Sequence, residues 1–230
     1  MTAFFDALPP GFLLHLLGGV SINFWIAAIG LVLGLAVGLP LAICLASGSR
    51  WLRWAASPVT ALMRAAPTFV TMYFLFQVLQ AGPGGGTALS PVMTVAWALM
   101  PYAAAYIADS GADALRHWRA GSFSAALLFL PNLVRAYFVM VMSSGISAAI
   151  GVQEGISIIL RQANAMGSFP QQLGVYLLGI LVFGSIMQVG LLGVGALRRF
   201  AIALMLNRAN RRAAAQSDLD FDGSRIDPTE

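Results

Sequence analysis

The feature that most constrains this chain is an almost unbroken apolar run over residues 12–46, in which only His15, Ser21 and Asn23 are polar. One perpendicular helix needs about 20 residues to cross a bilayer, so this longer run predicts an interfacial start followed by a tilted membrane helix. Further apolar segments follow, and only 10% of all residues are charged, against about a quarter in soluble domains. The sequence therefore predicts an all-α integral membrane protein with about five transmembrane helices.

The predicted spans lie near residues 15–46, 67–80, 92–108, 123–151 and 173–197, within a transmembrane domain over residues 12–200 that follows a short N-terminus, residues 1–11. The Gly- and Pro-rich residues 80–91 are expected to form a loop, and so are the polar residues 153–172. Residues 201–230 are basic and then acidic. Because the part beyond Ala213 contains almost no apolar residues, we expect this tail to be disordered.

The arginines predict the orientation of these spans. With five spans, one set of loops contains Arg50, Arg53, Arg64, Arg116, Arg119, Arg198, Arg199, Arg208, Arg211 and Arg212, and the opposite set only Arg161. Positive residues remain on the cytoplasmic side, so the N-terminus is expected outside and the C-terminus in the cytoplasm. Residues 1–10 have no basic residue and so lack the n-region of a cleaved signal peptide; the first span should remain as an anchor.

Glycine recurs every fourth residue in the first span, at Gly30, Gly34 and Gly38. This spacing places three positions without side chains on one helix face, where a neighbouring helix can approach closely. Glycine enrichment that is general to membrane helices is the alternative. We expect close helix packing at this face.

Few residues could support catalysis. All thirteen basic residues are arginines, so the chain lacks the lysine of a phosphate-binding loop. Its two histidines, His15 and His117, fall on opposite sides of the membrane in this topology, and the single Cys44 allows neither a disulfide nor a cysteine metal site. We expect no catalytic and no metal site. The sequence pI near 9.8 is explained by arginines beside spans rather than by nucleic acid binding.

Charges cluster at residues 109–119, between two apolar segments. We expect a water-exposed loop there that could meet a soluble partner. Asp109 and Asp113, followed by Arg116, resemble an ion-paired helix end more than an acid–base pair. Asp109 could lie at the membrane boundary, where ionisable groups tend to be functional.

Two segments resemble the membrane subunit of a bacterial ABC importer of the polar amino acid type, which has the type I importer fold. In RAAPTFVTMYFLFQ, Arg64 and Pro67 match the family's segment, although Ala66 replaces its threonine. In ISAAIGVQE, Ile150, Gly151, Val152 and Glu154 match, although Gln153 replaces a proline. AAAYIAD, residues 103–109, is similar to the family's third span, and the resemblance covers about residues 11–200.

One departure concerns the family's cytoplasmic loop, which contains E-A-A, three residues and G and forms a short helix that docks into the ATPase. The chain is shorter than the family by roughly twenty residues between Tyr106 and Ile150, and this motif is absent. The resemblance implies a shortened ATPase-docking loop, with its remaining residues at Asp113, Arg116, His117, Arg119 and Gly121.

The resemblance also implies a function. It indicates a permease subunit of the bacterial inner membrane that forms half of a path for amino acid uptake, without cofactors of its own, while a partner ATPase binds ATP and Mg. By position, Ser143, Ser144, Ser147 and Asp109 are the candidates for lining the path. The implied partners are a second permease subunit of different sequence, cytoplasmic ATPase subunits and a periplasmic substrate-binding protein.

Two alternatives remain open. The chain could be a permease-derived scaffold or regulatory subunit that does not transport, which the shortened loop favours. An ion channel or secondary carrier would need charged residues within the spans, and these are nearly absent.

Overall fold

The computed structural model describes residues 8–80 and 89–223, and every regular element within them is helical. These elements are α2 (Phe12–Leu45), α3 (Arg50–Ala65), α4 (Thr68–Gln80), α5 (Pro91–Arg119), α6 (Phe123–Leu127), α7 (Phe129–Ser144), the 3-10 helix η1 (Gly145–Ile150), α8 (Gly155–Ala165) and α9 (Phe169–Gly223). The N-terminal residues, the loop predicted over residues 80–91 except at its two ends, and the last residues of the tail lie outside the described residues.

Four of the described segments are long and apolar enough to cross a membrane: Phe12–Leu45, Pro91–Arg119, Ala125–Ile150 and Phe169–Ala196. A fifth candidate is the pair α3 and α4, which meet at a bend of 89°. The prediction of an all-α protein with about five membrane helices is therefore confirmed.

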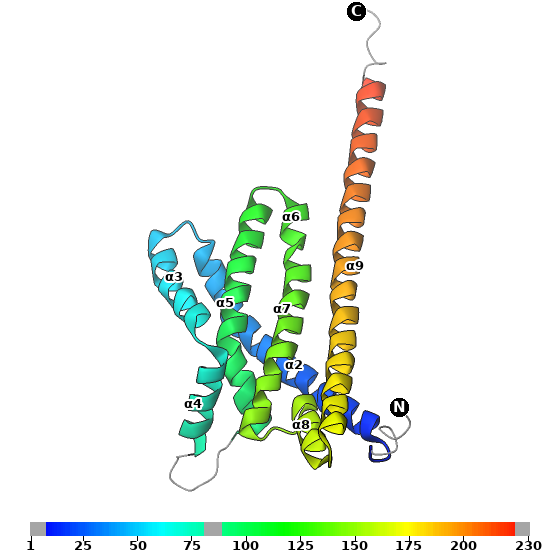
Figure 1. The fold of residues 1–230 in the computed structure, drawn as a ribbon. Helices are drawn as coiled ribbons and strands as arrows, with labels where there is room; N and C mark the ends of the chain where they lie inside the picture. The colour runs from blue at the N-terminus through cyan, green and yellow to red at the C-terminus, as the bar shows by residue number, and fades with distance from the viewer. Residues whose placement is uncertain (1–7, 81–88, 224–230) are drawn as a thin grey trace, which may run out of the picture.

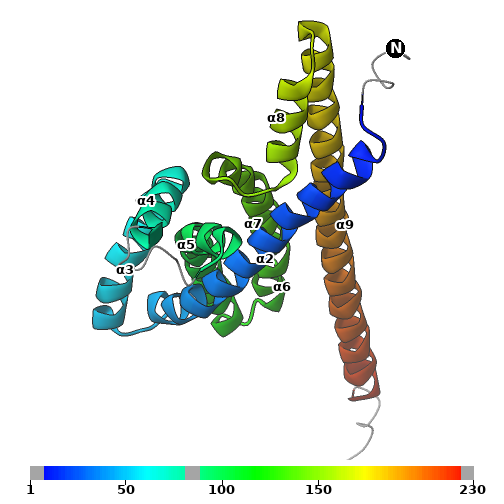
Figure 2. The ribbon, with the colours of Figure 1, turned by 90° about the horizontal axis from the view of Figure 1, so that it is seen from below.

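The bundle is organised around an antiparallel pair of helices, α5 and α7 (Figure 1). A turn at residues 120–122 and the short α6 connect them. We call this end of the bundle the hairpin end, and the end where η1 leads into α8 the opposite end (Figure 1). The helix α2 crosses the bundle obliquely, with α3 and α4 on one side of α5 and with α8 and α9 beyond α7 (Figure 2).

The glycine face of α2 packs directly on α5. A Cβ atom added at Gly34 would lie 2.4 Å from the Cβ of Ala103, and one at Gly38 would lie 2.7 Å from the carbonyl oxygen of Ala104. At Gly30 the added atom would lie 3.3 Å from the carbonyl oxygen of Ala96. Glycine on one helix and alanine on the other let the two backbones approach. Because α5 covers this face, the glycines form a contact within the chain.

The charged stretch at residues 109–119 is the last part of helix α5, which contradicts the loop expected there. The spacing explains the difference: Asp113 and Arg116 are three residues apart and form an ion pair of 2.8 Å along the helix, as side chains on one helix face can. Pro101 lies inside α5 without ending it. The connection to the next span is only residues 120–122, where Gly121 has a φ of 76°.

Three other boundaries differ from the prediction. The second span is preceded by a separate helix, α3, which lies between the first two predicted spans and was not predicted. The polar residues 153–172 contain α8, and the last span begins at Phe169. Residues 201–223, expected to be disordered, continue α9, because their alanines and arginines are strong helix formers.

Candidate functional site

The residues proposed to line a path fall in two separate places. Ser144 and Ser147 are fully buried near the opposite end of the bundle, and Ser143 donates a hydrogen bond of 2.9 Å to the Val139 carbonyl of its own helix. Asp109 lies on α5 towards the hairpin end, where it pairs with Arg64. The structure therefore does not bring these four residues into one site.

Ser144 belongs to a buried polar cluster that links three helices. The Asn23 side-chain amide of α2 donates hydrogen bonds of 2.9 Å to the hydroxyl of Ser144 and to the carboxylate of Glu154. The side-chain oxygen of the same amide, Asn23 Oδ1, accepts a hydrogen bond of 3.2 Å from the Gly155 backbone N–H. We call Asn23, Ser144 and Glu154 the polar cluster; none of the three is exposed.

Glu154 caps the start of α8. Its carboxylate accepts hydrogen bonds from the backbone N–H groups of Ile156 (2.9 Å) and Ser157 (2.8 Å), which have no partner within their own helix. Burial raises the pKa of the Glu154 carboxyl above its ordinary value, while hydrogen bonds from Ile156, Asn23 and Ser157 act to lower it. The carboxylate thus accepts three hydrogen bonds inside the protein, all from uncharged donors, as a buried polar group requires.

The helices α2 and α8 are also in close contact through their backbones. A Cβ atom at Gly19 would lie 3.0 Å from the Gly155 nitrogen and 2.3 Å from the Ile158 side chain, so α2 lacks a side chain where α8 begins. The sequence matched Glu154 to a family motif and noted Asn23 as polar, yet it could not show that they meet across 131 residues. Ser147 is the one fully buried side-chain donor or acceptor without a hydrogen-bond partner in the described part of the chain.

The bend between α3 and α4 is fixed by an ion pair. The Arg64 guanidinium, at the last turn of α3, contacts the Asp109 carboxylate on α5. Both side chains remain partly exposed, at 60% and 44%. The Asp109 carboxylate is thus already paired with an arginine of the same chain.

Two arginines expected to contact an ATPase instead cap the first span. Arg116 donates a hydrogen bond of 3.0 Å to the Leu45 carbonyl, and Arg119 donates one to the Ala46 carbonyl. The last carbonyls of a helix have no partner within it, and α2 has no basic residue in its own last turn. The α5 arginines supply these missing donors.

A polar groove of about 420 Å³ lies between α5 and the α6–α7 segment. Tyr106, Asp109, Asp113 and His117 line it from α5, and Asn132 lines it from α7. Four of the five residues assigned to the docking loop therefore share one helix, and two of them border this groove. We call it the hairpin groove.

Arg135 was not singled out from the sequence. It is the only Asp, Glu, Lys or Arg between residues 125 and 150, and thus the single charged side chain within the candidate span Ala125–Ile150. Its side chain is exposed and makes no hydrogen bond or ion pair with the described residues. Its position within a span is the signal that could have identified it.

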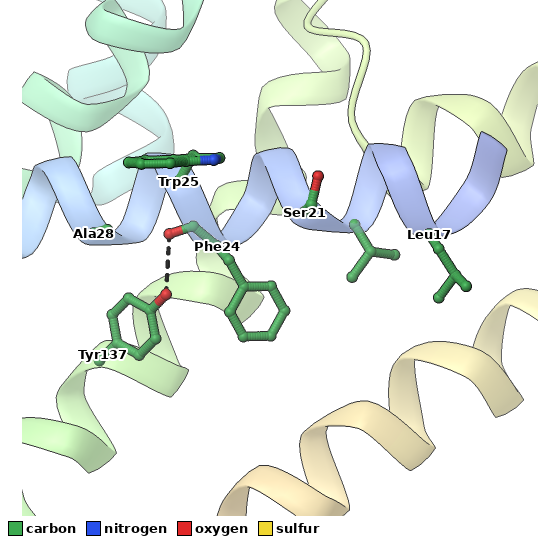
Figure 3. A pocket seen from close by; sticks show the side chains of 7 residues that line it. Leu17, Ser21, Phe24, Trp25, Ala28 and Tyr137 are labelled. Atoms are coloured by element: carbon green, nitrogen blue, oxygen red, sulfur yellow. Dashed lines mark hydrogen bonds between the residues drawn. The ribbon is translucent and has the colours of Figure 1, made fainter. Parts of the chain in front are cut away.

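A second groove, of about 440 Å³, lies on the outer side of α2, and Figure 3 shows it. Leu17, Phe24, Trp25 and Tyr137 are among the residues that line it, and the Tyr137 hydroxyl donates a hydrogen bond of 3.1 Å to the Phe24 carbonyl (Figure 3). No charged side chain lines it, so it is unsuited to a charged ligand. Among the described residues, no three His, Cys, Asp or Glu side chains lie together as metal ligands would.

Comparison with solved structures shows what the fold resembles. The chain superposes on a chain of an amino acid ABC transporter with histidines, with a TM-score of 0.65 and 14% identity, over 82% of this chain and 94% of that one. It also superposes on a chain of the MetNI methionine ABC transporter in inward-facing conformations, with a TM-score of 0.57 and 18% identity, over 82% and 99%. No protein-family model matches the sequence, and no curated protein matches it either. These likenesses show a shared multi-pass membrane fold.

Proposed function

We propose that this protein is the membrane-spanning subunit of an ATP-driven importer for amino acids and forms half of the translocation path. The observation that carries the proposal is the superposition over 82% of this chain on nearly the full length of two ABC transporter chains. The sequence motifs around Arg64 and Glu154 point to the same family independently of the superposition. Both residues make contacts that hold the fold together.

In this proposal the chain binds no nucleotide itself, and separate ATPase subunits bind ATP and Mg. The partners are those ATPases, a periplasmic binding protein and a second permease. The protein resides in a bacterial inner membrane with its hairpin end in the cytoplasm, because that end contains Arg116 and Arg119 and positive residues remain inside.

The connection between α5 and α6 favours a heteromer. It contains only residues 120–122, which leaves no room for a docking helix between these spans. We infer that a companion permease of different sequence provides the larger ATPase contact. His117 is the best remaining contact residue on this chain, since its side chain is exposed at the hairpin end and, unlike Arg116 and Arg119, it does not cap α2.

The same short connection favours a second candidate function, a scaffold or regulatory subunit that holds a partner without transporting. The two functions differ in a measurable way. A transport subunit is required for uptake by the purified complex, whereas a scaffold affects its assembly or its rate only.

The test starts with affinity purification of the tagged chain from membranes of its native host, followed by identification of the co-purified subunits. The complex is then reconstituted in proteoliposomes with a labelled mixture of amino acids and its binding protein. We expect uptake that requires ATP hydrolysis and this chain, and none with a non-hydrolysable ATP analogue. A complex that transports equally well without this chain would support the scaffold instead, and a working homodimer would contradict the heteromer.

His117→Glu tests the ATPase contact. We expect this variant to assemble normally in the membrane but to lose part of its ATPase binding, because it introduces a negative charge at an exposed position of the proposed contact. Unchanged binding and uptake in His117→Glu would remove this residue from the contact. Arg116→Glu is less informative alone, since it also removes a cap of α2.

A further inference from the structure

Polar side chains of α5 and α7 form a strip that contains none of the residues proposed to line the path. On α5, the rings of Tyr102 and Tyr106 stack with their centres 6.4 Å apart. On α7, Asn132 and Arg135 are three residues apart and therefore share a helix face. Asn132 and Tyr106 line the same groove, so the face of α7 that carries Asn132 and Arg135 lies against the tyrosines of α5. These four residues form the strip.

Arg135 lies deep in its span. Ten residues of helix, about 15 Å at 1.5 Å per residue, separate it from Ala125, where the candidate span begins. This is about half of the roughly 30 Å of a bilayer's hydrocarbon core. An arginine at that depth is strongly disfavoured against lipid, and arginines within spans usually face a water-filled cavity or a bound partner.

No carboxylate of the described residues neutralises Arg135. Asp109 pairs with Arg64, Asp113 pairs with Arg116, and Glu154 is buried in the polar cluster. Within the described part of the chain the arginine is thus an unpaired cation, and the neighbouring helix α5 carries the stacked pair of tyrosines. A guanidinium presents two parallel N–H donors to a carboxylate, and a phenol hydroxyl can donate a further hydrogen bond.

We propose that Arg135 binds the carboxylate of the transported amino acid, with Tyr102 and Tyr106 beside it as hydrogen-bonding groups. This assignment rests on the proposed transport function and adds a specific site to it. Tyr106 also lines the hairpin groove, so a substrate released from Arg135 has a polar surface next to it, towards the hairpin end.

The experiment compares Arg135→Gln with the wild type in the reconstituted complex, using the labelled amino acids that the wild type takes up. We expect the KM for uptake to rise about ten- to hundredfold, as loss of a charge-assisted hydrogen bond predicts, while ATP hydrolysis without substrate stays unchanged. Arg135→Lys, which retains the charge, should recover part of the loss. Arg161→Gln is the matched control, because it removes another exposed arginine, on α8.

A second measurement tests whether the site recognises the carboxylate of the substrate. Wild-type uptake should be inhibited by the unlabelled amino acid far more than by its carboxamide, and Arg135→Gln should lose this preference. An unchanged KM with the preference intact would overturn the assignment, and so would failure of both Arg135 variants to assemble, which would indicate a structural role. Absence of uptake by the wild type would instead refute the proposed function, so the two failures are distinguishable.

Discussion

Asn23 and Glu154 are joined by a hydrogen bond of 2.9 Å, although 131 residues separate them in the chain. One lies inside the first membrane helix, and the other begins a short helix between the last two spans. The side-chain oxygen Asn23 Oδ1 also accepts a hydrogen bond from the backbone N–H of Gly155, the residue that follows Glu154. This pair therefore joins the start of α8 to the first span inside the protein, beside the close contact at Gly19.

The first prediction concerns Asn23. Asn23→Leu should lower the free energy of unfolding by about 1–3 kcal/mol, because a buried carboxylate and a backbone N–H lose their partner. Asn23→Asp should be worse at neutral pH, since it places a second carboxylate beside Glu154. Thermal unfolding in detergent measures both. Ser21→Ala is the control, because Ser21 donates its hydrogen bond to the Gly18 carbonyl of its own helix. If all three variants were equally stable, the polar cluster would not contribute to stability.

The second prediction is a pH dependence. Burial raises the pKa of the Glu154 carboxyl above its ordinary value of 4.5, so the folded protein holds this proton more tightly than the unfolded chain. Stability from this group is therefore present below the unfolded pKa and is lost as the pH rises through the folded pKa.

Unfolding temperatures of the wild type and Glu154→Gln, compared from about pH 4 to about pH 8, test this directly. The glutamine cannot titrate, so the wild type should lose stability relative to the variant as the pH rises through this range. A difference between the two proteins that stays constant with pH would refute the prediction. Glu154→Gln should also be less stable than the wild type at the acidic end of this pH range. Its NH2 group cannot accept the hydrogen bonds that one oxygen of Glu154 receives.

The third prediction uses two glycines of one helix. Gly34→Leu should prevent α2 from packing on α5, because even a Cβ atom there would lie 2.4 Å from Ala103. Overpacking of this kind costs about 1–3 kcal/mol or more. Gly18→Leu is the matched control, since a Cβ at Gly18 meets no atom within 4 Å. Fluorescence-detected gel filtration should show loss of the folded peak for Gly34→Leu only; a normal peak for both would refute the close contact.

The fourth prediction is the orientation in the membrane. Reporter fusions after Arg119 and after Arg212 should be active on the cytoplasmic side, and those after Thr87 and Met166 on the outer side. The expectation follows from the distribution of arginines and from the five candidate spans. One reversed result among the four fusions would overturn the five-span topology.

Much of the fold could be predicted because apolar run length and glycine spacing are local properties of a sequence. The spans and the glycine face of α2 were found in this way. The end of α5 was not, because the charges of residues 109–119 suggested a loop, whereas Asp113 and Arg116 form an ion pair along a helix there.

The site was harder to predict because its contacts join distant residues. Arg64 and Asp109 were each noted in the sequence, yet no local pattern indicates that they pair across 45 residues. Ser144 and Ser147 were predicted to line a path, and no pattern in the sequence indicates that both are buried within the chain. Arg135 could have been found, since an isolated arginine within an apolar span is visible in the sequence alone.

The capping of α2 by Arg116 and Arg119 has a consequence for biosynthesis. The carbonyls of Leu45 and Ala46 obtain these donors only from residues made 71 and 73 positions later. During translation the first helix therefore enters the bilayer before these donors exist, and they appear only once α5 has been made. We infer that α2 together with α5 is the first packed unit of the nascent protein, closed along the glycine face and fastened at the hairpin end, and that the later helices assemble on that pair.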